Sequence, residues 1–307
     1  MTNIRKFLNK WLYLQAKNNY FYEIRNKDDS HNRSGCRSLL LLARGKEDTD
    51  FHYLLDEFAD LKVIRFQVPG WDALSLRQKE YAYHLSEAAK LGRDITWDQY
   101  CKWNLPIRHV VEDILNEYEG DRECADFQNF TVYAKRLFFA NGIHHHYSED
   151  KFFPECPKEY FQSLMEAVGD GEQATELLEV IYSPDIYPQR RSTSKTGDIV
   201  ELSAVNFYDG VTREEVDKYY NSMMDPNDKA PISYGLNTKV VKEDGKVVEK
   251  PWKVGGIYGP ALEKICAELE KAAAVAETDL QKEAIGKLVE YYRTGDLKTW
   301  DDFNIDW

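Results

Sequence analysis

Residues 144–150 concentrate side chains that can do chemistry. They read His-His-His-Tyr-Ser-Glu-Asp, so imidazole and carboxylate groups lie within seven residues. Both groups bind zinc in proteins, and a metal centre is one hypothesis for this cluster. Consecutive histidines chelate poorly, however, because neighbours face opposite sides of a strand and fan out around a helix, so at most two could share one ion. We therefore expect His144, His145 and His146 to have structural or substrate-contacting roles.

Two other segments invite a functional interpretation. Residues 122–126 read Arg-Glu-Cys-Ala-Asp, but no histidine lies at helical ligand spacing, so we expect this segment to begin and cap a helix. Residues 255–260 read Gly-Gly-Ile-Tyr-Gly-Pro and could cradle an anion at a helix N-terminus. They match neither a Walker loop nor the dinucleotide fingerprint, so a tight turn is favoured and no cofactor follows.

Recognised catalytic patterns are missing from the 307 residues. There is no His-Glu-x-x-His, no Gly-x-Ser-x-Gly and no matched Cys/His signature. The five cysteines are widely spaced and lack a Cys-x-x-Cys pair, which indicates free, mostly buried thiols. Composition and spacing alone therefore reveal no reaction.

The elements that would position these residues are mostly helices. Ser75 and Gln78 form a capping-box pattern for a helix that runs to about Lys90, with Gly92 as a left-handed stop. Helical periodicity also covers residues 106–120 and 126–139. Further helix starts are indicated at Pro157, Thr212, Pro260 and Thr278.

A smaller part of the chain has strand character. Residues 232–254 contain two β-prone runs around Asp244-Gly245, a strong hairpin signal, and residues 61–68 are a further strand candidate. No internal repeat or low-complexity tract follows residue 50. From residue 51 onward the sequence therefore indicates one α+β unit.

Composition excludes several classes of protein. The net charge of -13 argues against a nucleic-acid partner, because phosphate binding requires an excess of cations. The mean hydropathy of -0.61 and the short apolar run at residues 39–43 argue against a membrane span. Residues 1–50 carry a net charge of +4 and are expected to form a basic leader, either poorly ordered or a degenerate signal region. The localisation stays open between cytoplasm and periplasm.

Several long strings occur together in a fixed order. They are Phe58-Ala-Asp-Leu-Lys-Val63, Gly92-Arg-Asp-Ile95, Asn141-Gly-Ile-His-His-His-Tyr147, Ser233-Tyr-Gly-Leu-Asn237 and Tyr291-Tyr-Arg-Thr-Gly-Asp-Leu-Lys-Thr-Trp300. Together they resemble bacterial dipeptidyl peptidase III of the Bacteroides type, from about residue 51 to Trp307.

The resemblance implies a two-lobed zinc aminopeptidase that removes dipeptides from the N-termini of short peptides. Residues 51–307 would form the lower lobe, truncated at its C-terminal end. The implied fold is α+β and mostly helical, with a small β-sheet or a partial five-stranded barrel. Docking of an extended peptide along a lower-lobe strand is also implied.

The family's zinc ligands lie in His-Glu-x-x-x-His and Glu-Glu-Cys-Arg-Ala-Asp/Glu segments that would fall after Trp307. We therefore expect no catalytic residue, no metal ligand and no bound zinc in these 307 residues, and no activity by this chain alone. Whether the chain is an enzyme stays open at this point. The echo of the second motif at residues 122–126 is interpreted as a coincidence.

One substrate contact carries over from the family. Alignment through Gly142, Lys151 and Phe152 places Tyr147 where the family has an aromatic residue that lines the dipeptide pocket. Short peptides are therefore the expected partners. Two alternatives remain. The chain could be a lobe that binds either peptides or a separately encoded catalytic lobe, or it could be a remnant of a broken reading frame.

Overall fold

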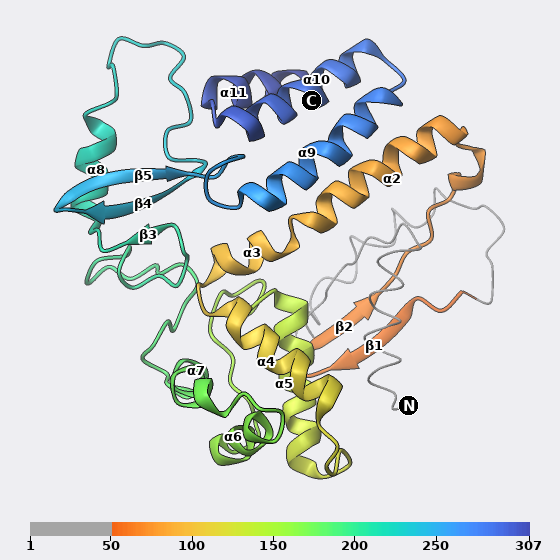
Figure 1. Ribbon diagram of the computed structural model, residues 1–307, viewed down its shortest axis with the longest axis vertical. Helices are drawn as coiled ribbons and strands as arrows, with labels where there is room; N and C mark the ends of the chain where they lie inside the picture. Colours follow the sequence, from red (N-terminus) through yellow and green to blue (C-terminus); the bar gives the residue numbers. More distant parts are fainter. Residues whose placement is uncertain (1–50) are drawn as a thin grey trace, which may run out of the picture.

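The computed structural model describes residues 51–307, which form helices and five short strands (Figure 1). The basic leader expected over residues 1–50 lies outside the described residues. The mostly helical α+β fold expected from the sequence is confirmed. Among the described residues, no helix is both long and apolar enough to cross a membrane.

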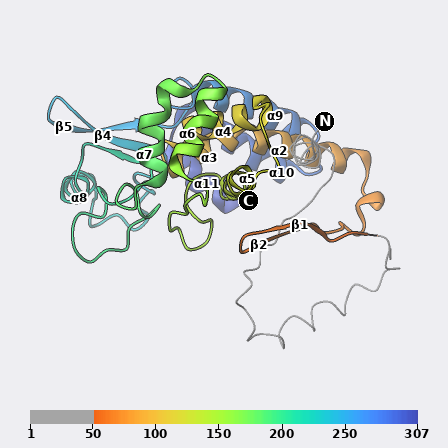
Figure 2. The same cartoon turned by 90° about the horizontal axis from the view of Figure 1, so that it is seen from below.

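The described part of the chain begins with an antiparallel hairpin. Strand β1 (Leu54–Phe58) pairs with β2 (Leu61–Ile64) through the two-residue turn at Ala59 and Asp60. The strand expected over residues 61–68 is present but ends at Ile64, and its partner β1 was not foreseen. Phe58, Leu61 and Val63 are buried and Phe139 packs against them, which attaches the hairpin to the helices. In Figure 2 the hairpin lies below the helical body.

Helix α2 (Leu76–Leu91) follows the short 3-10 turn η1 (Trp71–Ala73). Both hydrogen bonds of the expected capping box between Ser75 and Gln78 are present. The expected left-handed stop at Gly92 is wrong, because Gly92 has a φ of -83° and helix α3 (Arg93–Tyr100) begins directly after it. Gly92 therefore joins two helices instead of ending one.

The largest cluster of buried side chains lies among four helices. They are α4 (Asn104–Glu117), α5 (Ala125–Ala140), α6 (Lys158–Ala167) and α7 (Ala174–Tyr182), with the 3-10 turn η2 (Gly171–Gln173) before α7. Fully buried aromatic rings pack at its centre, with Phe130 and Phe161 edge to face and Phe127 tilted against Phe130. Burial of such rings stabilises a fold by about 1.5–3 kcal/mol for each side chain.

A three-stranded sheet lies on the opposite side of the molecule from the β1–β2 hairpin in Figure 1. Strand β3 (Tyr208–Asp209) pairs in parallel with β4 (Thr238–Glu243), which pairs antiparallel with β5 (Lys246–Pro251). The expected hairpin turn is confirmed, because Asp244 and Gly245 both have positive φ, 50° and 76°. Helix α8 (Arg213–Asn221) has the capping box expected at Thr212. The five strands form two small sheets.

The remaining helices complete a layer with α2. Helix α9 (Gly259–Ala274) packs on α2, α10 (Asp279–Thr294) packs on α9, and α11 (Leu297–Asp306) packs on α10 (Figure 1). Apolar side chains such as Leu262, Ile265 and Ile285 form a second buried cluster there. The capping box expected at Thr278 is present at the start of α10.

Candidate functional site

The loop that carries the histidines starts where α5 ends. Asn141 has a left-handed conformation, with a φ of 56°, and Gly142 has a φ of 147°. A β-carbon at Gly142 would lie 2.2 Å from Nδ2 of Asn104, so no larger residue fits. Asn104 is fully buried, accepts a hydrogen bond from the Ile143 amide at 3.2 Å and donates one to the Trp97 carbonyl at 3.0 Å. Asn104, which the sequence analysis did not single out, therefore holds the start of the loop.

His144 points into the protein and is 2% exposed. Its Nε2 donates a hydrogen bond to the carbonyl of Tyr187 at 2.9 Å. Burial lowers the pKa of His144 to about 4, although the hydrogen bond to Tyr187 opposes this effect. His144 is therefore a neutral, structural residue at pH 7, consistent with one of the roles expected for the histidines.

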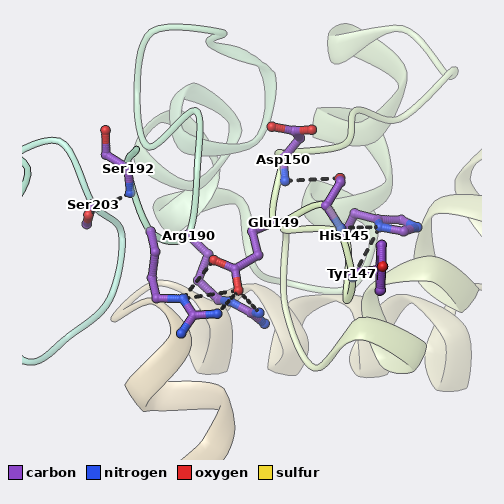
Figure 3. A network of polar contacts seen from close by, with 9 residues as sticks. His145, Tyr147, Glu149, Asp150, Arg190, Ser192 and Ser203 are labelled. Atoms are coloured by element: carbon purple, nitrogen blue, oxygen red, sulfur yellow. Dashed lines mark hydrogen bonds and ion pairs between the residues drawn. The ribbon is translucent and has the colours of Figure 1, made fainter. Parts of the chain in front are cut away.

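His145 is buried against the turn that it begins. Its Nδ1 accepts hydrogen bonds from the amides of Tyr147 and Ser148 at 3.2 and 3.1 Å. Because this lone pair is occupied, the proton of the neutral ring resides on Nε2. That nitrogen lies 3.4 Å from Oδ2 of Asp60, in the turn between β1 and β2. Figure 3 shows the ring of His145 beside Tyr147.

His146 is half-buried and lies against other rings. Its imidazole is 4.3 Å from that of His145 and 5.3 Å from the ring of Phe139, measured between centroids. Burial is the largest effect lowering the pKa of His146 to about 4, with His145 adding to it. The three histidines therefore have three separate environments.

The described histidines do not gather into a zinc site. Nδ1 of His145 already accepts two amide hydrogens, so this nitrogen is not available to a metal. Over residues 51–307, no three His, Cys, Asp or Glu side chains are placed to hold one metal ion. We therefore derive no chemical step through a metal in this part of the chain.

Among the large apolar and aromatic residues of the loop, Tyr147 is the most exposed. Its side chain is 82% exposed to solvent, whereas those of His144 and His145 are buried. The bend after it places Glu149 in a left-handed conformation, with a φ of 65°. The loop therefore presents one aromatic ring outward from a buried base.

Two arginines hold the far side of the loop. Glu149 accepts a hydrogen bond from Nη2 of Arg190 at 2.6 Å and from Nε of Arg191 at 2.8 Å (Figure 3). The hydrogen bonds from Arg191, followed by those from Arg190, lower the pKa of Glu149 to about 2. The guanidinium of Arg190 also lies 4.1 Å from the ring centroid of Tyr100. Glu149 is therefore a structural carboxylate.

Lys151 and Asp150 close the loop onto its neighbours. The buried Lys151 ammonium donates hydrogen bonds to the carbonyls of Ser183 and Ile186 at 2.6 and 2.8 Å, and burial lowers its pKa to about 8. Asp150 accepts a hydrogen bond from Nε2 of Gln189 at 3.1 Å. The charged side chains Glu149, Asp150 and Lys151 thus all tie the loop to neighbouring segments.

A small cavity lies next to the loop's anchor. It has a volume of about 170 Å³, and Tyr187, whose carbonyl holds His144, is one of its lining residues. Lys102 and Lys239 also line it. Nζ of Lys239 donates a hydrogen bond to Oδ1 of Asn206 at 2.7 Å, so this lysine is fixed in place.

The two other segments singled out in the sequence have structural roles. Helix α5 begins at Ala125 as expected, but Cys124 at the cap makes no side-chain capping bond. Instead, Arg122 donates to the carbonyls of Leu115 and Tyr118, at the end of α4. The expected capping of α5 is therefore wrong, and Arg122 caps the C-terminal end of the preceding helix, α4.

The turn at residues 255–260 makes a close backbone approach. A β-carbon at Gly256 would lie 2.5 Å from the carbonyl oxygen of Pro251. Tyr258 has a φ of 62° and donates a hydrogen bond from Oη to Oδ2 of Asp98 at 2.5 Å. This geometry is the tight turn favoured by the sequence.

Comparison with known proteins supports one family. No family model matches the chain. Human dipeptidyl peptidase 3 is 24% identical in an alignment of 267 residues that covers 73% of this chain and 36% of that protein. Structures of dipeptidyl peptidase III from Caldithrix abyssi and Corallococcus sp. strain EGB have TM-scores of 0.48 and 0.47, at 18% and 17% identity. They align with 77% and 78% of this chain, and with 34% of each of those chains.

The chain therefore spans about a third of the length of the relatives it matches. The resemblance to dipeptidyl peptidase III is confirmed as a distant homology over that third. The narrower Bacteroides type has no support from these relatives.

Proposed function

Because this chain is distantly homologous to dipeptidyl peptidase III over about a third of that protein, we propose that residues 51–307 form a peptide-contacting lobe. In this proposal Tyr147 contacts the bound peptide. The observation that carries it is the contrast within one loop between the buried base, which hydrogen bonds hold in place, and the Tyr147 side chain, which is 82% exposed.

An exposed tyrosine on a loop whose backbone is held is suited to binding a peptide. Its ring offers a large apolar surface and its hydroxyl a hydrogen bond, at a low cost in side-chain entropy. The loop is already held by Asn104, His145, Glu149 and Lys151, so binding does not have to order it. The acidic balance of the chain also favours peptides with a free amino group.

The sheet offers a second possible peptide contact. Strand β5 is six residues long and lies at one edge of the three-stranded sheet, whereas β3 at the other edge has only two residues. An extended peptide can add to such an edge through backbone hydrogen bonds. We propose β5 as the lower-lobe strand implied by the family resemblance.

We propose no hydrolytic role for the residues of this chain. It lacks the family's His-Glu-x-x-x-His segment, and over residues 51–307 no three His, Cys, Asp or Glu side chains are placed to hold one metal ion. We expect no turnover when the purified chain is incubated with zinc and a dipeptidyl-naphthylamide. Turnover that a chelator abolishes would overturn this assignment.

Peptide binding is tested by calorimetric titration with an unmodified tetrapeptide such as Ala-Phe-Ala-Phe. We expect saturable binding that Tyr147→Ala weakens about tenfold, or about 1.4 kcal/mol, through the loss of one aromatic contact. Tyr83→Ala is the matched control, because Tyr83 is 56% exposed on α2, away from the loop. Absence of saturable binding by the unmodified chain would contradict the proposed function. Equal weakening of peptide binding by both variants would contradict the proposed contact between Tyr147 and the peptide.

A further inference from the structure

We propose that His145 is a positioning residue for Tyr147, held as the Nε2-protonated tautomer that faces Asp60. The inference rests on the proposed function and deepens it, because it names the group that presents the peptide-contacting ring. It is carried by three observations, namely two amides that converge on Nδ1, a carboxylate opposite Nε2, and the contacts that hold this carboxylate in place.

The first observation concerns the acceptor. The amides of Tyr147 and Ser148, two and three residues after His145, both donate to its Nδ1. This is the pattern in which an Asx side chain holds a turn, here formed by an imidazole. The backbone closes the same turn, because the Glu149 amide donates to the His145 carbonyl at 3.0 Å. A proton on Nδ1 would oppose both amide hydrogens, so this tautomer is incompatible with the turn.

The second observation concerns the opposite nitrogen. Nε2 of His145 has no hydrogen-bond partner within the described residues, and Oδ2 of Asp60 faces it at 3.4 Å as an electrostatic contact. His145 itself is 8% exposed, so solvent does not replace that partner. The carboxylate stabilises a proton on Nε2, which leaves Nδ1 free to accept.

The third observation concerns how Asp60 is held. It occupies the tight turn after Phe58, a core residue of the β1–β2 hairpin. Oδ1 of Asp60 lies 3.8 Å from Nη2 of Arg136 on α5, and Nζ of Lys135 bonds to Asp56 on β1 at 2.8 Å. The hairpin is therefore tied to α5, the helix from which the loop emerges. His145 thus connects the presented ring to two elements that are fixed relative to each other.

Two substitutions separate the functions of the two ring nitrogens. In His145→Asn, the side-chain oxygen can occupy the position of Nδ1 and accept both amides, but the side chain does not reach Asp60. In His145→Gln, the amide nitrogen can reach toward Asp60, but the acceptor near the backbone is lost. We expect the Tyr147 and Ser148 amides to exchange with solvent within about threefold of the unmodified rate in His145→Asn and at least about tenfold faster in His145→Gln.

Peptide affinity should follow the exchange rates. We expect His145→Asn to retain affinity within about threefold and His145→Gln to lose about tenfold. This rescue by asparagine is not expected for a residue that only fills space. Slow exchange at both amides in His145→Gln, or an equal loss of affinity in both variants, would overturn the proposal.

The tautomer can be measured without peptide and without any variant. Nitrogen-15 NMR of the imidazole is expected to show an unprotonated Nδ1 and a protonated Nε2 at pH 7. A protonated Nδ1 would overturn the inference even if the variants fail to fold. If the tautomer and exchange rates are as expected but the unmodified chain binds no peptide, the proposed function fails and the local geometry stands.

Discussion

At the scale of single residues, His144 makes stability depend on pH. Its pKa is about 4 in the folded protein because of burial, against 6.5 for an ordinary histidine. Between these pH values the unfolded chain binds a proton that the folded chain does not bind, so stability falls as the pH falls. Below about pH 4 this residue adds no further loss. We expect a contribution of the order of 3 kcal/mol between pH 7 and 4.

The variant His144→Gln tests this prediction. Its amide can still donate to the carbonyl of Tyr187, but it does not titrate. Urea unfolding at pH 7 and pH 4 should show a smaller loss of stability in the variant than in the unmodified chain. His146 titrates in both proteins and Glu149 titrates at lower pH, so the difference isolates His144. An identical pH dependence would contradict the assignment.

Residue-scale roles in the loop could be predicted only in part. The sequence indicated that the three histidines would not share a metal well, because neighbouring side chains diverge. It did not indicate Asn104, which lies 39 residues before Ile143, or Asp60, which lies 85 residues before His145. Contacts at such separations depend on how the helices and the hairpin pack, and no local pattern encodes that packing.

At the scale of elements, the β4–β5 hairpin depends on the backbone of its turn. Gly245 has a φ of 76° and nothing lies within 4 Å of a β-carbon built on it, so Gly245→Ala adds backbone strain without a clash. The left-handed conformation costs about 1–2 kcal/mol for a residue with a β-carbon. We expect urea unfolding to show a destabilisation of that size.

The same substitution at Gly286 is the matched control. Gly286 is exposed in the interior of α10, and its β-carbon would also meet nothing within 4 Å. Alanine there is expected to stabilise the protein by about 0.5–1 kcal/mol, because glycine is a poor helix former. If the same substitution destabilises the protein at Gly245 and stabilises it at Gly286, the effect comes from backbone conformation. Changes of the same sign in the free energy of unfolding would contradict this account.

Elements with local signals were the predictable ones. The capping boxes at Ser75, Thr212 and Thr278 lie within four residues and were found from sequence, as was the Asp-Gly turn. Helix α7 was not predicted, and its cap at Gln173 makes no side-chain bond. Strand β1 was missed because Leu54–Phe58 has a bulge and lacks simple alternation.

At the scale of the whole molecule, Asp98 joins parts that are distant in sequence. Its Oδ2 accepts hydrogen bonds from Tyr258 at the start of α9 and from Asn206, which in turn binds Lys239 of β4. A hydrogen bond to a charged group contributes about 1.5–3 kcal/mol. We therefore expect Tyr258→Phe to lower the free energy of unfolding by that amount. Tyr83→Phe, on the exposed side of α2, should change it by less than about 0.5 kcal/mol.

The outcome distinguishes a connecting role from a local one. Loss of the Tyr258 hydroxyl is expected to speed amide exchange in β4 as well as in α9, because Asn206 and Lys239 share the same carboxylate network. Faster exchange confined to α9 would contradict a connecting role for Asp98. Circular dichroism of the folded variant checks that the helices remain formed.

Helix α3 has a further consequence for how the protein deforms. Trp97 belongs to the buried cluster of α4–α7, and its carbonyl holds Asn104 at the base of the loop. The next residue, Asp98, holds Tyr258 of α9. A single peptide unit thus joins the loop that presents Tyr147 to the layer formed by α2, α9, α10 and α11. We therefore expect a displacement of the Trp97 carbonyl to move Asp98 as well, so that the loop and this layer are coupled through α3.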